Sequence, residues 1–260
     1  MDNAAIIGYG VVGKATADIF GIKKHYDINP EKSNITLGTA AKCRYAFICL
    51  PTALDADGRY HLDDIVSIIK RLEELGANCL YIIRSTVAPG FALHLQEELG
   101  IDRIISNPEF LTESTAEKDS RFPSFILLGG IVPRYLEELK AVYEGRIKAA
   151  PVILTDNTTA ELAKLSLNAF FATKVIYANQ IYDFARKLGA NYEIIRRVLE
   201  GHPFGSKNHF QVWFKGKRGI HGKCLPKDAR ALGNYSASEL IQKVNQLNET
   251  YIYLKEDENL

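Results

Sequence analysis

One cysteine lies in a segment whose residue types suit a reactive thiol. The segment has the sequence Gly219-Ile220-His221-Gly222-Lys223-Cys224-Leu225-Pro226-Lys227-Asp228. Glycine lets a backbone approach a ligand closely, and proline stiffens the loop that contains it. The thiolate is the attacking form of cysteine, and the flanking Lys223 and Lys227 favour that negative charge. A lone cysteine is more often buried and inert, but this setting is unlike a protein core, so Cys224 is predicted to be a nucleophile.

A lysine and an asparagine, Lys164 and Asn168, are four residues apart in a stretch without proline or glycine. Residues at this spacing share one face of a helix, with about 5–6 Å between their Cβ atoms. Such a pair can stabilise an alkoxide or a tetrahedral oxyanion through the ammonium group and an amide hydrogen bond. Two solvated surface side chains are the alternative for this common spacing.

Two further polar segments follow predicted strands. Arg84-Ser85-Thr86-Val87-Ala88-Pro89-Gly90 lies at the carboxyl end of a strand predicted at 79–83, where open α/β sheets bind ligands. A helix N-cap at Ser85 or Thr86 is the alternative there. In Ser106-Asn107-Pro108-Glu109-Phe110-Leu111-Thr112-Glu113, the two glutamates are four residues apart and share a face if the segment is helical. Solvated glutamates are the alternative reading of that pair.

A glycine-rich turn near the N-terminus predicts a dinucleotide site. Gly8-Tyr9-Gly10-Val11-Val12-Gly13 follows a predicted strand at 4–7 and precedes a predicted helix at 14–20. A second strand ends at Asp27, the offset at which an acid meets the adenosine ribose. The glycines permit a tight turn, and the helix N-terminus faces the phosphates. Asp27 repels a 2′-phosphate, which favours NAD over NADP, although Lys23 and Lys24 could soften that repulsion.

Together these motifs resemble the UDP-glucose/GDP-mannose dehydrogenase family, whose members oxidise a sugar primary alcohol to a carboxylate with two molecules of NAD. The similarity is carried by the Gly-x-x-Gly-x-Cys-x-Pro-Lys-Asp segment, by Asn107-Pro108-Glu109-Phe110-Leu111 with Glu113, and by Ser85-Thr86-Val87 with Gly90. Pro51-Thr52 and the Lys164/Asn168 pair also match the family pattern. The resemblance covers nearly the whole chain.

The resemblance implies a role for each matching residue. Cys224 would trap an aldehyde as a thiohemiacetal whose oxidation gives a thioester. Lys164 and Asn168 would stabilise the oxyanions, and a water held by Asp228 and Lys164 would take the hydroxyl proton. Glu109 and Thr86 would orient the hydrolytic water. The implied cofactor contacts, beyond the glycine turn and Asp27, are Lys32, Pro51, Thr52, Ser85, Thr86, Glu113 and Lys227, although Lys32 could equally be a solvated surface charge. The implied sugar contacts are Phe110, Leu111, Lys164, Asn168 and Gly222.

The alternation of elements predicts an α/β fold: a Rossmann-like parallel sheet followed by an all-helical second domain, with domains at 1–157 and 158–260. Further strands are expected at 45–50, 79–83, 103–105 and 125–130, the last closing the sheet, and helices at 62–75 and 133–143. Thr158 and Glu161 have capping-box spacing at the start of a long helix to residue 188. Helices at 192–200 and 236–254 should follow.

Three features depart from the family pattern. Ile220 and His221 stand where the cysteine loop customarily has Phe and Gly, and His221 would be strained if that position needs a positive φ. Phe204-Gly205-Ser206-Lys207 stands where relatives commonly have Arg-Ile-Gly. Full-length relatives continue into another α/β domain that holds much of the nucleotide, and this sequence is expected to be a short form without it.

Composition limits the partners and the compartment. The net charge is +1 with 24% charged residues, so neither a nucleic acid nor an anionic membrane is an expected partner. No apolar run reaches the ~18 residues of a membrane span. The four cysteines lack metal spacing, so no metal is expected and a reducing, cytoplasmic setting fits best. A homodimer through the last helix is expected, because its stripe of Leu240, Ile241, Val244 and Leu247 should be exposed.

Two other functions stay open at this point. A 3-hydroxyacid dehydrogenase has a similar domain plan with a catalytic Lys-x-x-x-Asn, but it performs one hydride transfer and has no use for Cys224 or for the segment around Glu109. A non-catalytic NAD-binding remnant is the other alternative. Oxidation of a nucleotide sugar, most simply UDP-glucose to UDP-glucuronate, is the prediction that accounts for all the motifs.

Overall fold

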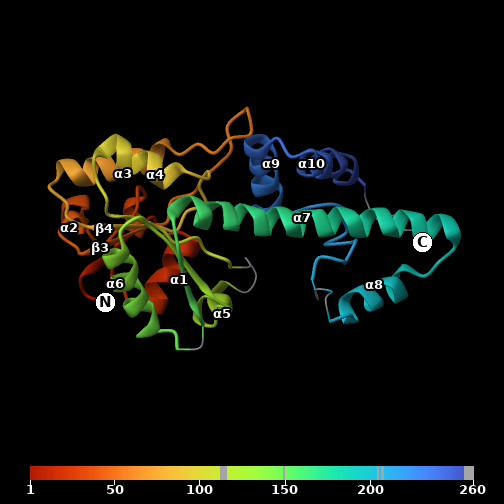
Figure 1. Ribbon diagram of the computed structural model, residues 1–260, viewed down its shortest axis with the longest axis horizontal. Coiled ribbons are helices and arrows are strands. Elements are labelled where there is room, and N and C mark those ends of the chain that lie inside the picture. The colour runs from red at the N-terminus through yellow and green to blue at the C-terminus, as the bar shows by residue number, and fades with distance from the viewer. Residues whose placement is uncertain (112–115, 149, 204, 206–207, 255–260) are drawn as a thin grey trace. The chain divides into compact units, whose positions relative to one another are not determined.

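The structure, a computed structural model, describes residues 1–111, 116–148, 150–203, 205 and 208–254. Contacts within the chain divide it into two units, Met1–Ala53 with Tyr60–Lys164 and Leu54–Arg59 with Leu165–Leu260. Figure 1 shows the elements of each unit in chain order. The domains predicted from the sequence, 1–157 and 158–260, remain a prediction about independent folding, which a division by contacts does not test.

The first unit is built on a seven-stranded sheet with the order β2-β1-β3-β4-β5-β6-β7. The strands are β1 (Ala4–Ile7), β2 (Lys24–Tyr26), β3 (Tyr45–Ile48), β4 (Leu80–Ile83), β5 (Ile104–Ser106), β6 (Ile126–Gly129) and β7 (Val152–Thr155). Strands β1 to β5 pair in parallel. The short, almost wholly apolar runs of β1, β3, β4 and β5 are typical of parallel strands that are covered on both faces, whereas the edge strand β2 is polar and half-buried. The predicted fold class, a mostly parallel Rossmann-like sheet followed by helices, is confirmed.

Two details of the sheet differ from the prediction. Strand β6 pairs antiparallel with β5, through Ser106 and Gly129, so the sheet is not parallel throughout. Strand β7 pairs in parallel with β6, so the strand predicted at 125–130 does not close the sheet. Strand β7, with the sequence Val-Ile-Leu-Thr, lies at the edge of the sheet and is only half-buried, and it was not predicted because so short an apolar run is not distinctive.

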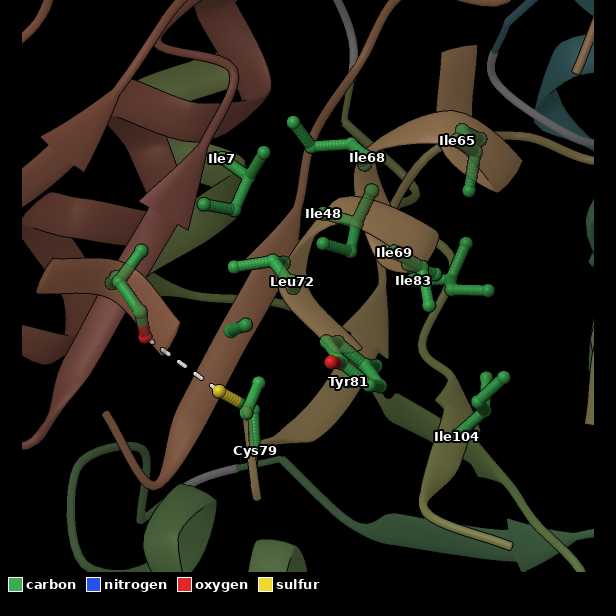
Figure 2. Packing of buried hydrophobic residues seen from close by; sticks show 14 of the residues in the cluster. Ile7, Ile48, Ile65, Ile68, Ile69, Leu72, Cys79, Tyr81, Ile83 and Ile104 are labelled. Atoms are coloured by element: carbon green, nitrogen blue, oxygen red, sulfur yellow. Dashed lines mark hydrogen bonds between the residues drawn. The ribbon is translucent and has the colours of Figure 1, made fainter. Parts of the chain in front are cut away.

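Helices cover the two faces of this sheet, and alternate residues of each strand belong to two cores. Helices α2 (Leu37–Ala41), α3 (Asp63–Glu74) and α4 (Phe91–Leu99) pack on one face. Figure 2 shows that core, where Ile7, Ile48 and Ile83 from neighbouring strands meet Ile69 and Leu72 of α3. Helices α1 (Val11–Phe20) and α6 (Pro133–Glu144) pack on the other face. The remaining short helices are η1 (Pro30–Lys32) and α5 (Ala116–Arg121).

Helices make up most of the second unit. Helix α7 (Asn157–Leu188) gives residues 157–164 to the first unit and the rest to the second, which also holds α8 (Tyr192–Gly201), α9 (Leu225–Ser236) and α10 (Glu239–Tyr251). None of the helices in the described part of the chain combines the length and the apolar character needed to span a bilayer.

The apolar stripe of α10 is not the exposed surface that the sequence predicted. Val244 and Tyr251 are buried against α7 and α9 of the same unit, and Leu247 packs on the same core. Only Leu240, 63% exposed, faces solvent as expected. A helical stripe shows that one face of a helix is covered, and it does not distinguish cover by the same chain from cover by a second one.

Candidate active site

The glycine turn has the backbone that a bound diphosphate requires. Gly8 has a φ of +92°, and a Cβ there would lie 2.7 Å from the carbonyl oxygen of Cys49. A Cβ at Gly13 would lie 2.0 Å from the carbonyl oxygen of Gly8. Helix α1 begins at Val11, three residues earlier than predicted, and its N-cap, Gly10, has no neighbour within 4 Å of an added Cβ. Its first N–H groups have no partner in the helix and suit an anion, so the residues present fit a dinucleotide.

Asp27 lies directly after β2 and is tied to the glycine turn. Its carboxylate accepts hydrogen bonds from the backbone N–H of Tyr9 at 2.7 Å and of Asn29 at 2.9 Å. Lys24 lies at the other end of β2 and donates to the carbonyl of Asp2 at 2.9 Å, so it does not soften the charge of Asp27. The side chain of Lys32 is exposed.

The loops after β3 and β4 are hydrogen-bonded to each other. The hydroxyl of Thr52, which follows Pro51, donates to the carbonyl of Thr86 at 2.8 Å, and the hydroxyl of Ser85 donates to the carbonyl of Leu50 at 2.7 Å. Neither Ser85 nor Thr86 caps a helix, because α4 begins at Phe91. The alternative of a simple N-cap is therefore wrong, and both residues lie at the carboxyl edge of the sheet.

Lys164 and Glu109 form a buried ion pair in the first unit. The ammonium nitrogen lies 3.5 Å from Glu109 Oε1 and 5.3 Å from the centre of the Phe110 ring. Glu109 Oε2 also accepts the N–H of Leu111 at 2.6 Å. A cation in such a dry setting is well suited to hold an oxyanion. Glu113, the other predicted glutamate, lies outside the described residues.

Cys224 is the N-cap of α9 and is exposed. Asp228, in the first turn of that helix, is fully buried and accepts a hydrogen bond from Asn168 Nδ2 at 2.6 Å. Lys227 Nζ lies 3.0 Å from the other carboxylate oxygen. A helix N-terminus favours a thiolate. The fixed carboxylate of Asp228, one turn later, is a group that can accept or donate a proton. The structure thus brings Asn168 of α7 into contact with Asp228, which also pairs with Lys227, in the first turn of the helix that Cys224 caps.

The loop before Cys224 is fastened to its own unit at its first two residues. The N–H of Ile220 donates to Asn248 Oδ1 of α10 at 2.6 Å, and the Ile220 side chain is buried. Gly219 and Gly222 have the positive φ values of this loop, +85° and +92°. His221 is not in that region, so the strain considered for this residue does not arise.

Comparison with known proteins shows the family of this chain. A model of the UDP-glucose/GDP-mannose dehydrogenase family, NAD binding domain, matches residues 28–147, and the model of the same family's central domain matches residues 158–250. The chain belongs to this family. Its first part therefore contains the family's NAD-binding domain, which the glycine turn precedes in the sequence.

The chain is similar to the UDP-glucose 6-dehydrogenase of Streptococcus pneumoniae, with 32% identity over 72% of this chain and 49% of that protein. It is equally similar to the GDP-mannose 6-dehydrogenase of Pseudomonas savastanoi pv. phaseolicola, with 32% identity over 78% of this chain and 48% of that protein. The chain thus spans about half the length of the curated relatives that it matches.

Two solved structures show the same fold. One is a UDP-glucose dehydrogenase from Pyrobaculum islandicum, with a TM-score of 0.84 and 24% identity, covering 96% of this chain and 68% of that one. The other is a 3-hydroxyisobutyrate dehydrogenase from Mycobacterium tuberculosis, with a TM-score of 0.74 and 16% identity, covering 98% of this chain and 97% of that one. At such identities the likeness concerns the fold alone.

One buried residue at the edge of this family's predicted site was missed in the sequence. Glu161 was assigned to a capping box with Thr158, but Asp156 caps α7 instead, through the N–H of Thr159 at 2.8 Å. Glu161 turns inward and accepts the N–H of Gly90 at the start of α4 at 2.7 Å. Spacing could not reveal this, because Glu161 and Gly90 are 71 residues apart.

The exposure of Cys224 gives the first prediction. Cys43, Cys49 and Cys79 are at most 7% exposed, and burial raises the pKa of both Cys49 and Cys79 to about 12. A rise from 9.0 to about 12 lowers the thiolate population roughly a thousandfold. Iodoacetamide should therefore label Cys224 first, as measured by peptide mass spectrometry. The Cys224→Ala variant, labelled in its folded state, should stay unmodified. Equal labelling of Cys49 would contradict the burial.

Proposed function

We propose that this protein is an NAD-dependent dehydrogenase that oxidises the primary alcohol of a nucleotide sugar to a carboxylate, most simply UDP-glucose to UDP-glucuronate. The observation that supports it most is Cys224, exposed at the start of α9, with Asp228 held by Asn168 one turn later. NAD, when bound, supplies the acceptor for each of two hydrides. A reaction of one hydride transfer needs no such cysteine.

The residues divide the proposed work between proton transfer, charge stabilisation and covalent chemistry. In the first oxidation Asp228 helps to remove the hydroxyl proton through a water, and the ammonium of Lys164 stabilises the alkoxide. The Cys224 thiolate then adds to the aldehyde carbon and gives a thiohemiacetal, whose oxidation leaves a thioester. Glu109 and Thr86 orient the water that releases the acid and restores the thiol. Each sugar thus consumes two NAD and one water.

A second candidate is a 3-hydroxyacid dehydrogenase-like enzyme. The Lys164 and Asn168 pair of α7 favours this candidate, because that family also has a catalytic Lys-x-x-x-Asn. A turnover assay decides, with NADH and sugar acid counted for UDP-glucose, GDP-mannose, UDP-N-acetylhexosamines and a 3-hydroxyacid. Two NADH per sugar support the proposal, and one NADH per hydroxyacid supports the second candidate. If none of these substrates is turned over, the result supports the third alternative, a non-catalytic NAD-binding remnant.

Cofactor choice is the second prediction, since Asp27 should pair with a ribose diol and repel a phosphate. NAD should bind at least about tenfold more tightly than NADP, a difference of about 1.4 kcal/mol. Asp27→Asn should lose most of this preference, while Asp18→Asn, on the surface of α1, should keep it. Fluorescence titration with both cofactors measures this. Equal affinities in the wild type would refute the role of Asp27.

A homodimer is the third prediction. Because the apolar stripe of α10 is covered by its own unit, the proposed interface lies on α7 instead. Phe170, Tyr177 and Phe184 are each at least half exposed and recur every seven residues along α7, a spacing that suits helix pairing. Light scattering should give twice the chain mass at micromolar protein. Tyr177→Glu should give the monomer, while Phe122→Glu, at a still more exposed aromatic residue of the first unit, should not. A monomeric wild type would contradict the proposal.

The predicted cytoplasmic location stays a prediction.

A further inference from the structure

Glu161 joins three elements at the carboxyl edge of the sheet. Its side chain lies on the first turns of α7 and is 3% exposed. The N–H of Gly90 at 2.7 Å and the N–H of Ala92 at 3.1 Å donate to it from the start of α4. The hydroxyl of Ser106, the last residue of β5, donates to it at 2.8 Å. One buried carboxylate therefore holds helix α4 and strand β5 against helix α7.

The arrangement favours the ionised carboxylate. Gly90, the N-cap of α4, has no side chain to satisfy the first N–H groups of that helix, so Glu161 supplies the acceptor from another element. Both of its oxygens accept hydrogen bonds, and the positive end of the α4 dipole favours their negative charge. A protonated carboxyl has to donate one hydrogen bond, which neither N–H group can accept, so the acceptor would have to be the Ser106 hydroxyl, to which Asn157 Nδ2 already donates at 3.1 Å.

The same carboxylate borders a cavity that carries residues of the proposed reaction. The lining residues of this cavity are Ile83, Ser85, Thr86, Val87, Ser106, Pro108, Glu161 and Lys164. Thr86 belongs to the loop that ends at Gly90, which Glu161 holds. Lys164 follows Glu161 by three residues on α7 and so lies on the neighbouring turn of the same face.

We infer that Glu161 is a positioning residue whose carboxylate keeps the Thr86 loop and Lys164 in register around this cavity. The inference rests on the proposed function, because Thr86 and Lys164 are assigned to that reaction. Glu161 itself makes and breaks no bond in it. Its removal should leave both groups present but misaligned, and misplacement of about 1 Å can slow a reaction roughly a hundredfold.

The ionisation of Glu161 gives this role a pH dependence. Burial raises the pKa of the carboxyl to about 7, against the opposing effect of the Ser106 hydroxyl and the backbone amides of α4. The charged group that lines the same cavity is Lys164, which pairs with Glu109, while the start of α4 presents two N–H groups and β5 presents a hydroxyl. As the pH falls through about 7, protonation should break the arrangement, so kcat should fall on the acid side.

The test compares kcat and KM of the wild type with those of Glu161→Gln and Ser106→Ala, from about pH 5.5 to about pH 8.5. Glu161→Gln should lower kcat roughly 10- to 100-fold, leave KM within a few-fold and abolish the inflection near neutrality. Ser106→Ala should move that inflection to higher pH, because the lost hydroxyl had favoured the carboxylate. The matched control is Glu138→Gln, whose carboxylate bonds Arg44 and Tyr45 at the amino end of β3 and should affect thermal stability alone.

Hydrogen exchange gives a readout that does not need turnover. The amides of Gly90 and Ala92 should exchange faster in Glu161→Gln than in the wild type or in Glu138→Gln. If Glu161→Gln fails to fold, Ser106→Ala carries the test through the shift of its inflection. A wild-type kcat and pH profile in Glu161→Gln, or an unmoved inflection in Ser106→Ala, would overturn the inference. If the wild type makes no NADH from any sugar, the proposed function fails, and unchanged exchange at Gly90 and Ala92 would then refute the structural part separately.

Discussion

Cys224→Ser should stop the formation of the sugar acid while leaving the first oxidation possible. A serine hydroxyl is a poor nucleophile without a strong base beside it, and an ester on serine hydrolyses more slowly than a thioester. We expect acid formation to fall by on the order of a thousandfold, or about 4 kcal/mol in the barrier. The wild type should release two NADH per sugar, and the variant should stall with bound intermediate.

The measurement combines NADH counting with mass spectrometry of the intact protein after incubation with NAD and UDP-glucose. Cys43→Ser is the matched control, because it removes a buried thiol near the amino end of the sheet and should keep two NADH per sugar. Two NADH per sugar at a near wild-type rate in Cys224→Ser would make the cysteine structural. One NADH per substrate in the wild type would favour the hydroxyacid dehydrogenase instead.

The substitution is informative because contacts of other residues hold the surroundings of Cys224. Asp228 is fixed by Asn168, and the preceding loop is fixed by Asn248 and by the buried Ile220. Cys224 itself is exposed at the start of α9. Serine is close to cysteine in size, so the helix and the loop should keep their positions.

The sequence was sufficient for the parts of the fold that rest on local patterns. Strand β1 was predicted with its observed limits, and the inner strands and long helices were placed within a few residues, because apolar runs and helical periodicity are local properties. The direction of β6 could not be predicted, since an apolar run has no sign of direction. The edge strand β7 was missed because an apolar run of only three residues does not by itself distinguish a strand from other structures.

The candidate site was predictable where a motif carried it, and not where a fold contact does. The glycine turn and the cysteine loop each occupy a short continuous segment, and their backbones have the positive φ values at glycine that such turns use. Glu161 and Asn248 act on residues 71 and 28 positions away, through contacts that exist only in the folded chain. The role of Glu161 was also hidden by spacing that fits an ordinary helix cap.

Lys164→Met should slow both oxidations, unlike the substitution at Cys224. The ammonium group is proposed to stabilise the alkoxide in the first oxidation and the oxyanions that follow, so its loss is felt at each step. We expect kcat to fall about 100- to 1,000-fold, as for the loss of one preorganised donor to an oxyanion, with a smaller change in KM. Stopped-flow records of NADH formation should show the first hydride step slowed as strongly as the steady state.

Lys174→Met is the matched control on the same helix, since Lys174 is a buried lysine that packs on the rings of Phe170, Phe171 and Phe210. It should stay within a few-fold of wild-type activity. Loss of Lys164 also leaves the buried carboxylate of Glu109 unpaired, which by itself destabilises a fold. The double variant Lys164→Met/Glu109→Gln removes that charge, so it should recover stability and remain slow. Recovery of activity together with stability would mean that Lys164 serves only to neutralise Glu109.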